Sequence, residues 1–348
     1  MCASDGSPSA ALPRPAEGRA VDPVRLEPVD ELVVTTLVDN VFDALLAPAE
    51  GVARTSFAAA SAAAPQFLDG STPVGLVAEH GFAALVTVRR GDRTSTVLFD
   101  TGLSPTGMTE NAARLDVDWS AVQAVVLSHG HFDHAGGFAG LARATRSLPM
   151  TVHPGIWSQR RIAVPGVEPF AFPTLSRTAL EGEGFEVVER RQPSLLLDGS
   201  VLVTGEVDRV TEFERGMPAP HEALVDGSWQ HDPLVLDDQA LVVHVRDKGL
   251  VVLTGCGHAG AVNIARHALR LTGVDRLHGL LGGLHLGGPA FEPVIPPTLA
   301  ALAELSPALL VPGHCTGWKA QHALAAAFPD AWVQGSVGSR YTVSAEAA

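Results

Sequence analysis

One short segment of the chain concentrates side chains that can bind metal ions. Residues 128–137 read SHGHFDHAGG, and His129, His131, Asp133 and His134 lie within six positions, directly after an apolar run typical of a buried strand. Alternate side chains of an extended backbone point the same way, so His129 and His131 can converge on one metal while Asp133 and His134 serve a second. A single histidine here would be read as solvated, but four ligands at this spacing favour a metal centre.

Such a centre predicts hydrolytic chemistry. Two divalent ions about 3.5 to 4 Å apart can share a water molecule, lower its pKa towards neutrality and so supply hydroxide as the nucleophile. One ion also polarises a phosphoryl or carbonyl oxygen of the substrate. Asp133 is the candidate catalytic residue, because its carboxylate can steer the hydroxide proton. Imidazole and carboxylate ligands suit zinc, which we favour, and they also suit iron or manganese.

Strand and helix patterns alternate over most of the chain and predict an α/β protein. Apolar, β-branched runs at 31–40 and 124–127 indicate strands, and the second of them leads straight into the metal-binding segment. Further strand patterns are followed by helical ones, as at 277–281 and 297–304. No internal repeat of fixed period is present.

The chain is expected to form one domain with a tail. Residues 1–30 are rich in Ala, Pro and charge and lack apolar periodicity, which predicts a disordered N-terminal tail. Residues 31–345 are expected to form a single domain. Within it, a stretch at about 155–235 is long, interrupted by proline and less periodic, and we interpret it as an insertion or lid.

Composition restricts the partners and the compartment. The chain of 348 residues has 24 Lys plus Arg against 38 Asp plus Glu, and its net charge of −14 disfavours nucleic acid as a partner. A small anionic substrate remains compatible with a local basic pocket. Cys2, Cys256 and Cys315 form no short-spaced pair, and the sequence has neither a signal-peptide core nor a membrane-length apolar run. We therefore expect a cytoplasmic protein without a membrane partner, and make no prediction of its oligomeric state.

The metal-binding segment matches H-x-H-x-D-H, the signature of the metallo-β-lactamase superfamily, in full. LFDTG at 98–102 resembles the first motif of that superfamily, in which the aspartate orients a metal-bound imidazole; Asp100 is the candidate for this role. Segments 251–264, 282–286 and 312–317 resemble the branch named after dihydropterin ribofuranosylaminobenzene phosphate synthase. The resemblance extends over nearly all of the chain from residue 31 to 343. It implies a four-layer αββα sandwich with the metals at one edge.

The resemblance also implies the remaining metal ligands. His258 would join the first two histidines of the segment at one metal, and His314 would join Asp133 and His134 at the other. Many members carry T-G-D where this chain has Thr-Gly-Cys, so either Cys256 ligates as a thiolate or His258 takes over, and we favour His258.

Two further residues have open roles. His285, in GGLHL, is a metal ligand, a substrate contact or a buried hydrogen-bonded imidazole. Arg209 is a candidate for binding an anionic substrate group by its planar fork if the middle stretch folds over the metals; a solvated pair with Glu206 is the alternative.

The predicted function is that of an enzyme, a binuclear metal-dependent hydrolase of a small anionic substrate. A phosphoester is favoured over a thioester or lactone. The name of the branch suggests an alternative, a synthase or transferase that joins a pterin to a ribofuranosylaminobenzene phosphate. A non-catalytic, metal-bearing sensor is a third hypothesis, against which the complete ligand set weighs.

Overall fold

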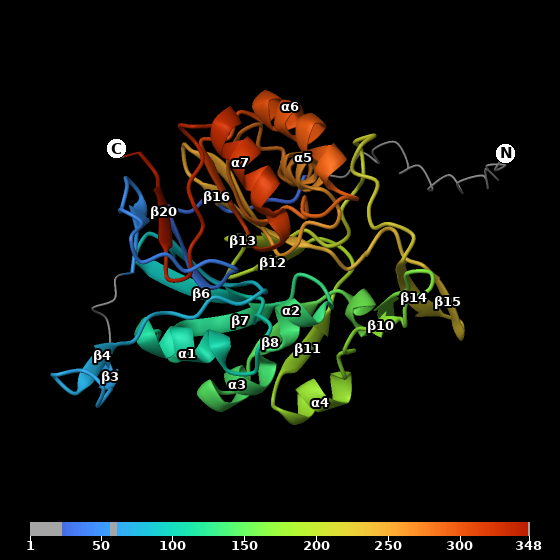
Figure 1. The fold of residues 1–348 in the computed structure, drawn as a ribbon. Helices are drawn as coiled ribbons and strands as arrows, with labels where there is room; N and C mark the ends of the chain where they lie inside the picture. Colours follow the sequence, from blue (N-terminus) through green and yellow to red (C-terminus); the bar gives the residue numbers. More distant parts are fainter. Residues whose placement is uncertain (1–22, 56–60, 347–348) are drawn as a thin grey trace.

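Two β-sheets lie face to face in the computed structural model, which describes residues 23–55 and 61–346 (Figure 1). The larger sheet has eight strands in the order β11-β8-β7-β6-β5-β1-β20-β2. These strands are β1 (Glu31–Val38), β2 (Val52–Ala53), β5 (Ala83–Arg90), β6 (Arg93–Phe99), β7 (Val122–Val126), β8 (Pro149–Val152), β11 (Glu186–Glu189) and β20 (Arg340–Ser344). Strands β6, β7, β8 and β11 run parallel, whereas β20, β1, β5 and β6 alternate in direction.

The second sheet has six strands in the order β12-β13-β16-β17-β18-β19. They are β12 (Ser194–Leu196), β13 (Val201–Val203), β16 (Ala240–Val245), β17 (Gly249–Thr254), β18 (Leu277–Gly283) and β19 (Leu309–Gly313). Strand β17 reads GLVVLT and is buried along its whole length, because it lies inside the sheet with other layers on both faces. Strands β17, β18 and β19 are parallel, so their carboxyl ends meet at one edge.

Apolar side chains of the two sheets form one core between them. Leu32, Val86 and Val97 of the larger sheet pack with Val243 and Leu253 of the smaller one, and these side chains are at most 2% exposed. Burial of this continuous apolar surface is the main term that holds the sheets together.

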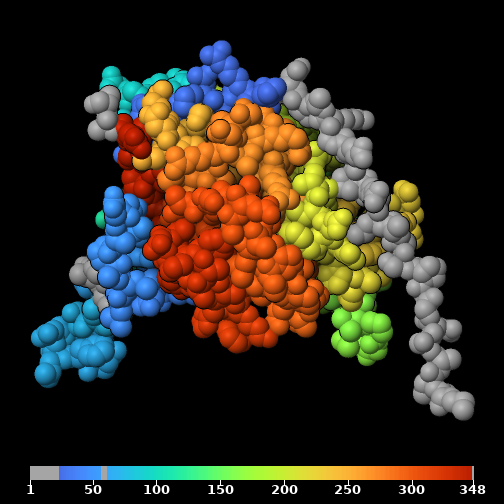
Figure 2. Space-filling view, turned by 90° about the horizontal axis from the view of Figure 1, so that it is seen from above, coloured from blue at the N-terminus to red at the C-terminus, as the bar shows by residue number. Residues whose placement is uncertain are grey.

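Helices cover the two outer faces. On the smaller sheet lie α5 (Ala261–Thr272), α6 (Ile295–Leu305) and α7 (Trp318–Ala327), and in Figure 2 they are part of the orange and red surface that dominates the view from above. On the larger sheet lie α1 (Gly107–Arg114), α3 (Phe138–Ala144) and α4 (Arg177–Gly182). The fold is therefore the four-layer αββα sandwich that the family resemblance implied.

Short elements complete the chain. A hairpin of β3 (Ser61–Ala63) and β4 (Ser71–Pro73) projects from one end of the molecule (Figure 1). The other short helices are α2 (Phe132–Ala135), η2 (Trp119–Ala121), η3 (Pro154–Trp157), η4 (Glu292–Val294) and η5 (His314–Thr316). Within the described residues, no helix combines the length and the apolar character needed to cross a bilayer.

The middle stretch at 155–235 is woven into the sandwich. It supplies the edge strand β11 to the larger sheet and β12 and β13 to the smaller one. The rest forms a separate four-stranded sheet in the order β10-β9-β14-β15, with β9 (Arg160–Ile162), β10 (Phe170–Ala171), β14 (His221–Val225) and β15 (Ser228–His231). This small sheet lies at the end of the molecule opposite the β3–β4 hairpin (Figure 1).

The domain begins earlier than residue 31. Residues 1–22 of the expected tail lie outside the described residues, but residues 24–30 pack against the sandwich. Val24 N donates to Leu271 O, and the fully buried Val29 donates from its N–H to His244 O. Val29 also bridges to Val245 at the end of β16. Leu26 and Val29, which lie in the stretch expected to be a tail, are both buried.

Replacing Leu253 tests the core between the sheets. Leu253→Ala removes a side chain that is fully buried between the layers, and we expect it to lower the free energy of unfolding by about 2 to 5 kcal/mol. Leu195→Ala on β12, where the side chain is 42% exposed, is the matched control and should change it far less. Urea unfolding followed by circular dichroism measures both; equal effects would contradict the burial pattern.

Candidate metal centre

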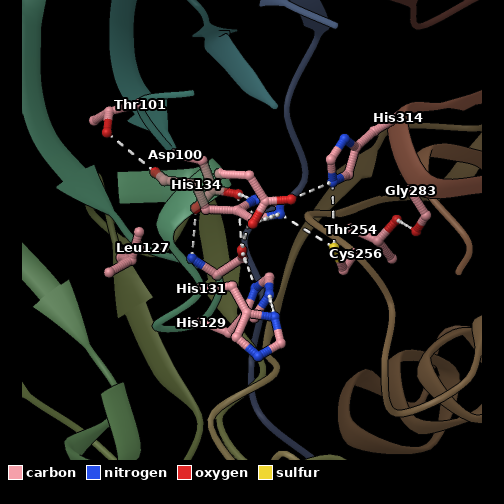
Figure 3. Close-up of polar contacts among 12 residues, drawn as sticks. Asp100, Thr101, Leu127, His129, His131, His134, Thr254, Cys256, Gly283 and His314 are labelled. Atoms are coloured by element: carbon pink, nitrogen blue, oxygen red, sulfur yellow. Dashed lines mark hydrogen bonds and ion pairs between the residues drawn. The ribbon is translucent and has the colours of Figure 1, made fainter. Parts of the chain in front are cut away.

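Ligand side chains come from loops at the carboxyl ends of strands in both sheets. Strand β7 of the larger sheet leads into the segment with His129, and β17 of the smaller sheet leads into the loop with Cys256 and His258. Strand β19 ends directly before His314. Figure 3 shows side chains from these loops pointing toward one another across the space between the sheets.

Three imidazoles form the first cluster. His129 Nε2 lies 3.0 Å from His131 Nδ1, and His258 Nε2 lies 3.1 Å and 3.2 Å from these two atoms. Three nitrogens bound to one tetrahedral zinc ion would be about 3.3 Å apart, given the usual zinc–nitrogen bond length. The spacing thus fits one shared cation, with the three residues that the sequence analysis assigned to the first metal.

Four residues form the second cluster. Cys256 Sγ lies 3.1 Å from His134 Nε2 and 3.3 Å from His314 Nε2, which is itself 3.3 Å from Asp133 Oδ2. The ligand atoms of these residues all lie within 4.8 Å of one another. Asp133, His134 and His314 are the residues expected at the second metal, and Cys256 joins them.

Cys256 lies between the two clusters. Its sulfur is close enough to group with His129 and His258 as well as with the second set. The sequence analysis weighed Cys256 against His258 as alternatives, but the structure brings both to the centre. The backbone explains this, because the two residues follow β17 in a tight turn whose Gly257 adopts a φ of +74°.

Asp100 anchors the metal-binding loop from behind. Its carboxylate accepts hydrogen bonds of 2.7 Å from the backbone N–H and the hydroxyl of Ser128, and one of 2.7 Å from His134 Nδ1. This contact directs the other ring nitrogen of His134 toward the second cluster, as expected from the sequence. Gly136 allows the close packing, since a Cβ there would lie 1.7 Å from Leu103 O.

Charge and burial set the protonation of the clusters. Burial lowers the pKa values of His129, His131 and His258 well below the usual range, so their rings are neutral and offer lone pairs. His134 differs: burial alone would lower its pKa, but the carboxylates of Asp100 and Asp133 more than offset this and raise it to about 9.

The acidic ligands complete this balance. Burial acts to raise the pKa of Asp133, but His134 and His314 outweigh it and hold the pKa well below the usual range, so the carboxylate is ionised. Burial raises the pKa of the Cys256 thiol, so a nearby cation is needed to keep it as a thiolate. The donor set therefore combines neutral imidazoles, the His134 ring, whose proton a metal would displace, one carboxylate and one thiol. These donors fit divalent metal ions.

His285 lies beside the centre. Its ring centroid is 4.3 Å from that of His258, and one of its ligand atoms groups with the sulfurs of Cys256 and Cys315. This place is compatible with a metal ligand or a substrate contact, whereas the Nδ1 atom of His285 has no hydrogen-bond partner in the part of the chain that the structure describes.

The guanidinium group of Arg209 donates hydrogen bonds to two backbone carbonyl oxygens, one of them in the loop that carries His258. Its Nη1 donates to His258 O at 3.1 Å, and its Nη2 donates to Leu234 O. These contacts hold the loop that carries His258. Both terminal nitrogens of the fork that was expected to bind an anionic substrate group thus donate to backbone oxygens.

Further residues outside the expected ligand set support the centre. His221 Nε2 lies 3.3 Å from His131 Nε2, and Asp237 accepts a hydrogen bond of 2.8 Å from Gly130 N. The buried Arg160 pairs with Asp237 through two hydrogen bonds. The place of Asp237 before a strand suits either a strand-entry cap or a contact behind the metal ligands, and the structure shows the second. His221 lies 90 residues from His131 in the least periodic part of the chain.

The open side of the centre is marked by His80. Its side chain is 63% exposed and its Nε2 lies 3.7 Å from Asp133 Oδ2. The amide nitrogen of Asn40 donates a hydrogen bond of 3.0 Å to Nδ1 of this ring. The amide oxygen of Asn40 accepts a hydrogen bond of 3.2 Å from His314 Nδ1. Asn40 thus orients both a ligand and the residue at the entrance.

Fold and site together define a protein of the metallo-β-lactamase fold. A model described as the metallo-beta-lactamase superfamily matches residues 79–155, which include the whole H-x-H-x-D-H segment. A solved structure described as a metal-dependent hydrolase of the beta-lactamase superfamily superposes with a TM-score of 0.66 at 23% identity, covering 90% of this chain and 99% of its own. The resemblance found in the sequence is therefore confirmed.

Two curated relatives come from Methanocaldococcus jannaschii. One is named 7,8-dihydropterin-6-methyl-4-(beta-D-ribofuranosyl)-aminobenzene-5'-phosphate synthase and is 28% identical over 250 residues, which cover 70% of this chain and 83% of the relative. The other, an uncharacterised protein, is 27% identical over 252 residues, with 70% and 86% covered.

Proton release on metal binding tests the charge balance. With a pKa of about 9, His134 is protonated at pH 7, so a metal that takes its Nε2 must displace a proton. Asp100→Asn removes one of the two charges that raise this pKa, and we expect it to release fewer protons at pH 7 than the wild type. At pH 10, above the pKa, the difference should vanish. Zinc calorimetry in buffers of different ionisation enthalpy measures the release; equal values at pH 7 would contradict the assignment.

Proposed function

We propose that this chain is a metal-dependent hydrolase of a small anionic substrate, with a phosphoester favoured. The observation that carries the proposal is the pair of adjacent buried ligand clusters that share Cys256. Two divalent ions there would supply an acidified water and a positive field for an anionic oxygen. The native metal we propose is zinc, since imidazole and thiol ligands suit it.

The chain's own groups support this chemistry. Asp133 is ionised and its side chain is 12% exposed, so it can accept a hydrogen bond from a water molecule and orient it. His80, at the entrance, is held by Asn40 with its Nε2 toward Asp133, where it can contact the substrate. The buried side of the centre excludes bulk water, because Asp100 and His134 are fully buried.

Aromatic side chains adjoin the first cluster and indicate what the substrate carries besides its anionic group. The Phe172 ring lies 5.1 Å from the His131 ring, and Phe132 and Phe170 lie 5.5 Å and 5.6 Å from Phe172. Phe170 is 57% exposed, so this apolar surface reaches solvent beside a metal ligand. An apolar wall next to a charged centre favours an ester with an aromatic group.

A transferase of the pterin pathway is the second candidate. The relative named as a synthase shares 28% of its aligned residues with this chain over most of its length, and a pterin ring would suit an aromatic wall. The two candidates differ in the acceptor, which is water for a hydrolase and an aminobenzene compound for the synthase.

A panel of chromogenic substrates tests the hydrolase. Protein of measured metal content is assayed with phosphomonoesters, phosphodiesters, thioesters and lactams, and we expect about two ions per chain and turnover of a phosphoester. His129→Ala and Asp133→Ala should lose metal and turnover together, because each removes a ligand. His322→Ala, at an exposed position of α7, is the control that should lose neither.

The same preparation separates the alternatives. Turnover by metal-free protein would refute the proposal outright. A pterin pyrophosphate consumed only in the presence of an aminobenzene acceptor would favour the synthase, and full metal loading without any turnover would favour a sensor.

Substitution of Phe172 tests the aromatic wall. Phe172→Ala should raise KM for an aryl phosphoester about three- to tenfold and leave KM for an alkyl phosphoester nearly unchanged, since only the aryl group contacts the ring. Phe67→Ala, which alters an exposed ring near the distant β3–β4 hairpin, is the matched control. Equal changes for both esters would show that Phe172 does not contact the substrate's aryl group.

A further inference from the structure

His221 reaches a metal ligand from the small four-stranded sheet. It is the first residue of β14, it is fully buried, and its Nε2 lies 3.3 Å from Nε2 of His131. His131 directs its other nitrogen, Nδ1, at the nitrogens of His129 and His258. The two nitrogens of His131 therefore have different partners, the metal cluster on one side and His221 on the other.

The hydrogen bonds around His221 have one consistent direction. Its Nδ1 lies 2.9 Å from the backbone oxygen of Asp232, and a carbonyl oxygen only accepts, so Nδ1 carries the proton. In a neutral imidazole that donates from Nδ1, the other nitrogen, Nε2, is the acceptor. Nε2 of His131 must then donate to it. A neutral His131 has one ring proton, so its Nδ1 keeps a free lone pair.

We propose that His221 is a positioning residue, which sets the tautomer of His131 so that Nδ1 is its metal-binding atom. In the opposite tautomer the Nδ1 proton would point into the first cluster, and the lone pairs of His131 and His221 would face each other. The contact with His221 disfavours that state before a metal arrives. Partners of this kind are known to raise the metal affinity of the ligands they orient.

The position of His221 is itself held firmly. Asp232 N donates back to His221 O at 3.0 Å, so the two residues are joined by a reciprocal pair of hydrogen bonds. The side chain of Asp232 accepts from Arg160 Nε at 3.0 Å, and Arg160 also binds Asp237. Asp237 in turn accepts from Gly130 N.

The small sheet and the residues around it thus make hydrogen bonds to two successive residues of the metal-binding loop. Asp237 holds the backbone at Gly130, and His221 holds the ring of His131. The middle stretch of the chain accordingly supports the metal centre directly. This inference concerns metal binding and does not depend on which reaction the centre performs.

Two substitutions of His221 separate positioning from packing. His221→Phe keeps a ring of similar shape but has no acceptor, whereas His221→Gln places an amide oxygen that can accept from His131 Nε2. His231→Phe, at an exposed position of the adjacent strand β15, is the control for disturbance of the small sheet. The first readout is zinc affinity, measured by competition with a chromophoric chelator. The second is the tautomer of His131 in nitrogen-15 histidine spectra of the zinc-loaded protein.

We expect His221→Phe to weaken the first zinc site about 10- to 100-fold, and His221→Gln to recover most of this loss. The spectra of the wild type and of His221→Gln should show His131 protonated at Nε2 and metal-bound at Nδ1. The control should bind zinc like the wild type. Any of four results would overturn the proposal. His221→Phe could bind zinc with wild-type affinity, the Phe and Gln variants could lose affinity equally, the control could lose as much, or His131 could be protonated at Nδ1. Because no substrate is used, failure here is distinct from failure of the hydrolase hypothesis.

Discussion

The structure depends on bringing several buried imidazoles to one point with their lone pairs facing one another. His129, His131 and His258 place three nitrogens within 3.2 Å of each other in the interior, where like charges cannot be tolerated. Burial keeps these rings neutral. Mutual repulsion of lone pairs is then relieved by a shared cation, so the arrangement is both costly without a metal and selective for one.

The sandwich meets this constraint because strands of both sheets end at one edge of the molecule, where their loops carry the ligands. Strands β7, β17 and β19 end at Val126, Thr254 and Gly313, a few residues or fewer before the ligands that their loops bring together. Asp100 holds His134 from the larger sheet, while Asn40 holds His314. The second ring nitrogens of His129, His131, His134 and His314 each have a hydrogen-bond partner, which orients these four rings before a metal binds.

The small four-stranded sheet lies beside His131 of the candidate metal centre. One of its strands carries His221, whose ring touches His131, and another carries Phe170, next to the ring of Phe172. The same element therefore contacts a ligand and forms the aromatic wall beside it.

The sequence alone determined what is local. His129, His131, Asp133 and His134 lie in one loop after one strand, so their spacing predicted two metal positions, and strand–helix alternation predicted the α/β class. His258 and His314 followed only from resemblance to a family. Tertiary structure decided the place of Cys256 between the clusters, the backbone contacts of Arg209 and the support by His221 and Asp237. Most of these contacts join residues that are 90 or more positions apart, as His131 and His221 are. Periodicity reports only local structure, so it carries no information about which distant loops meet.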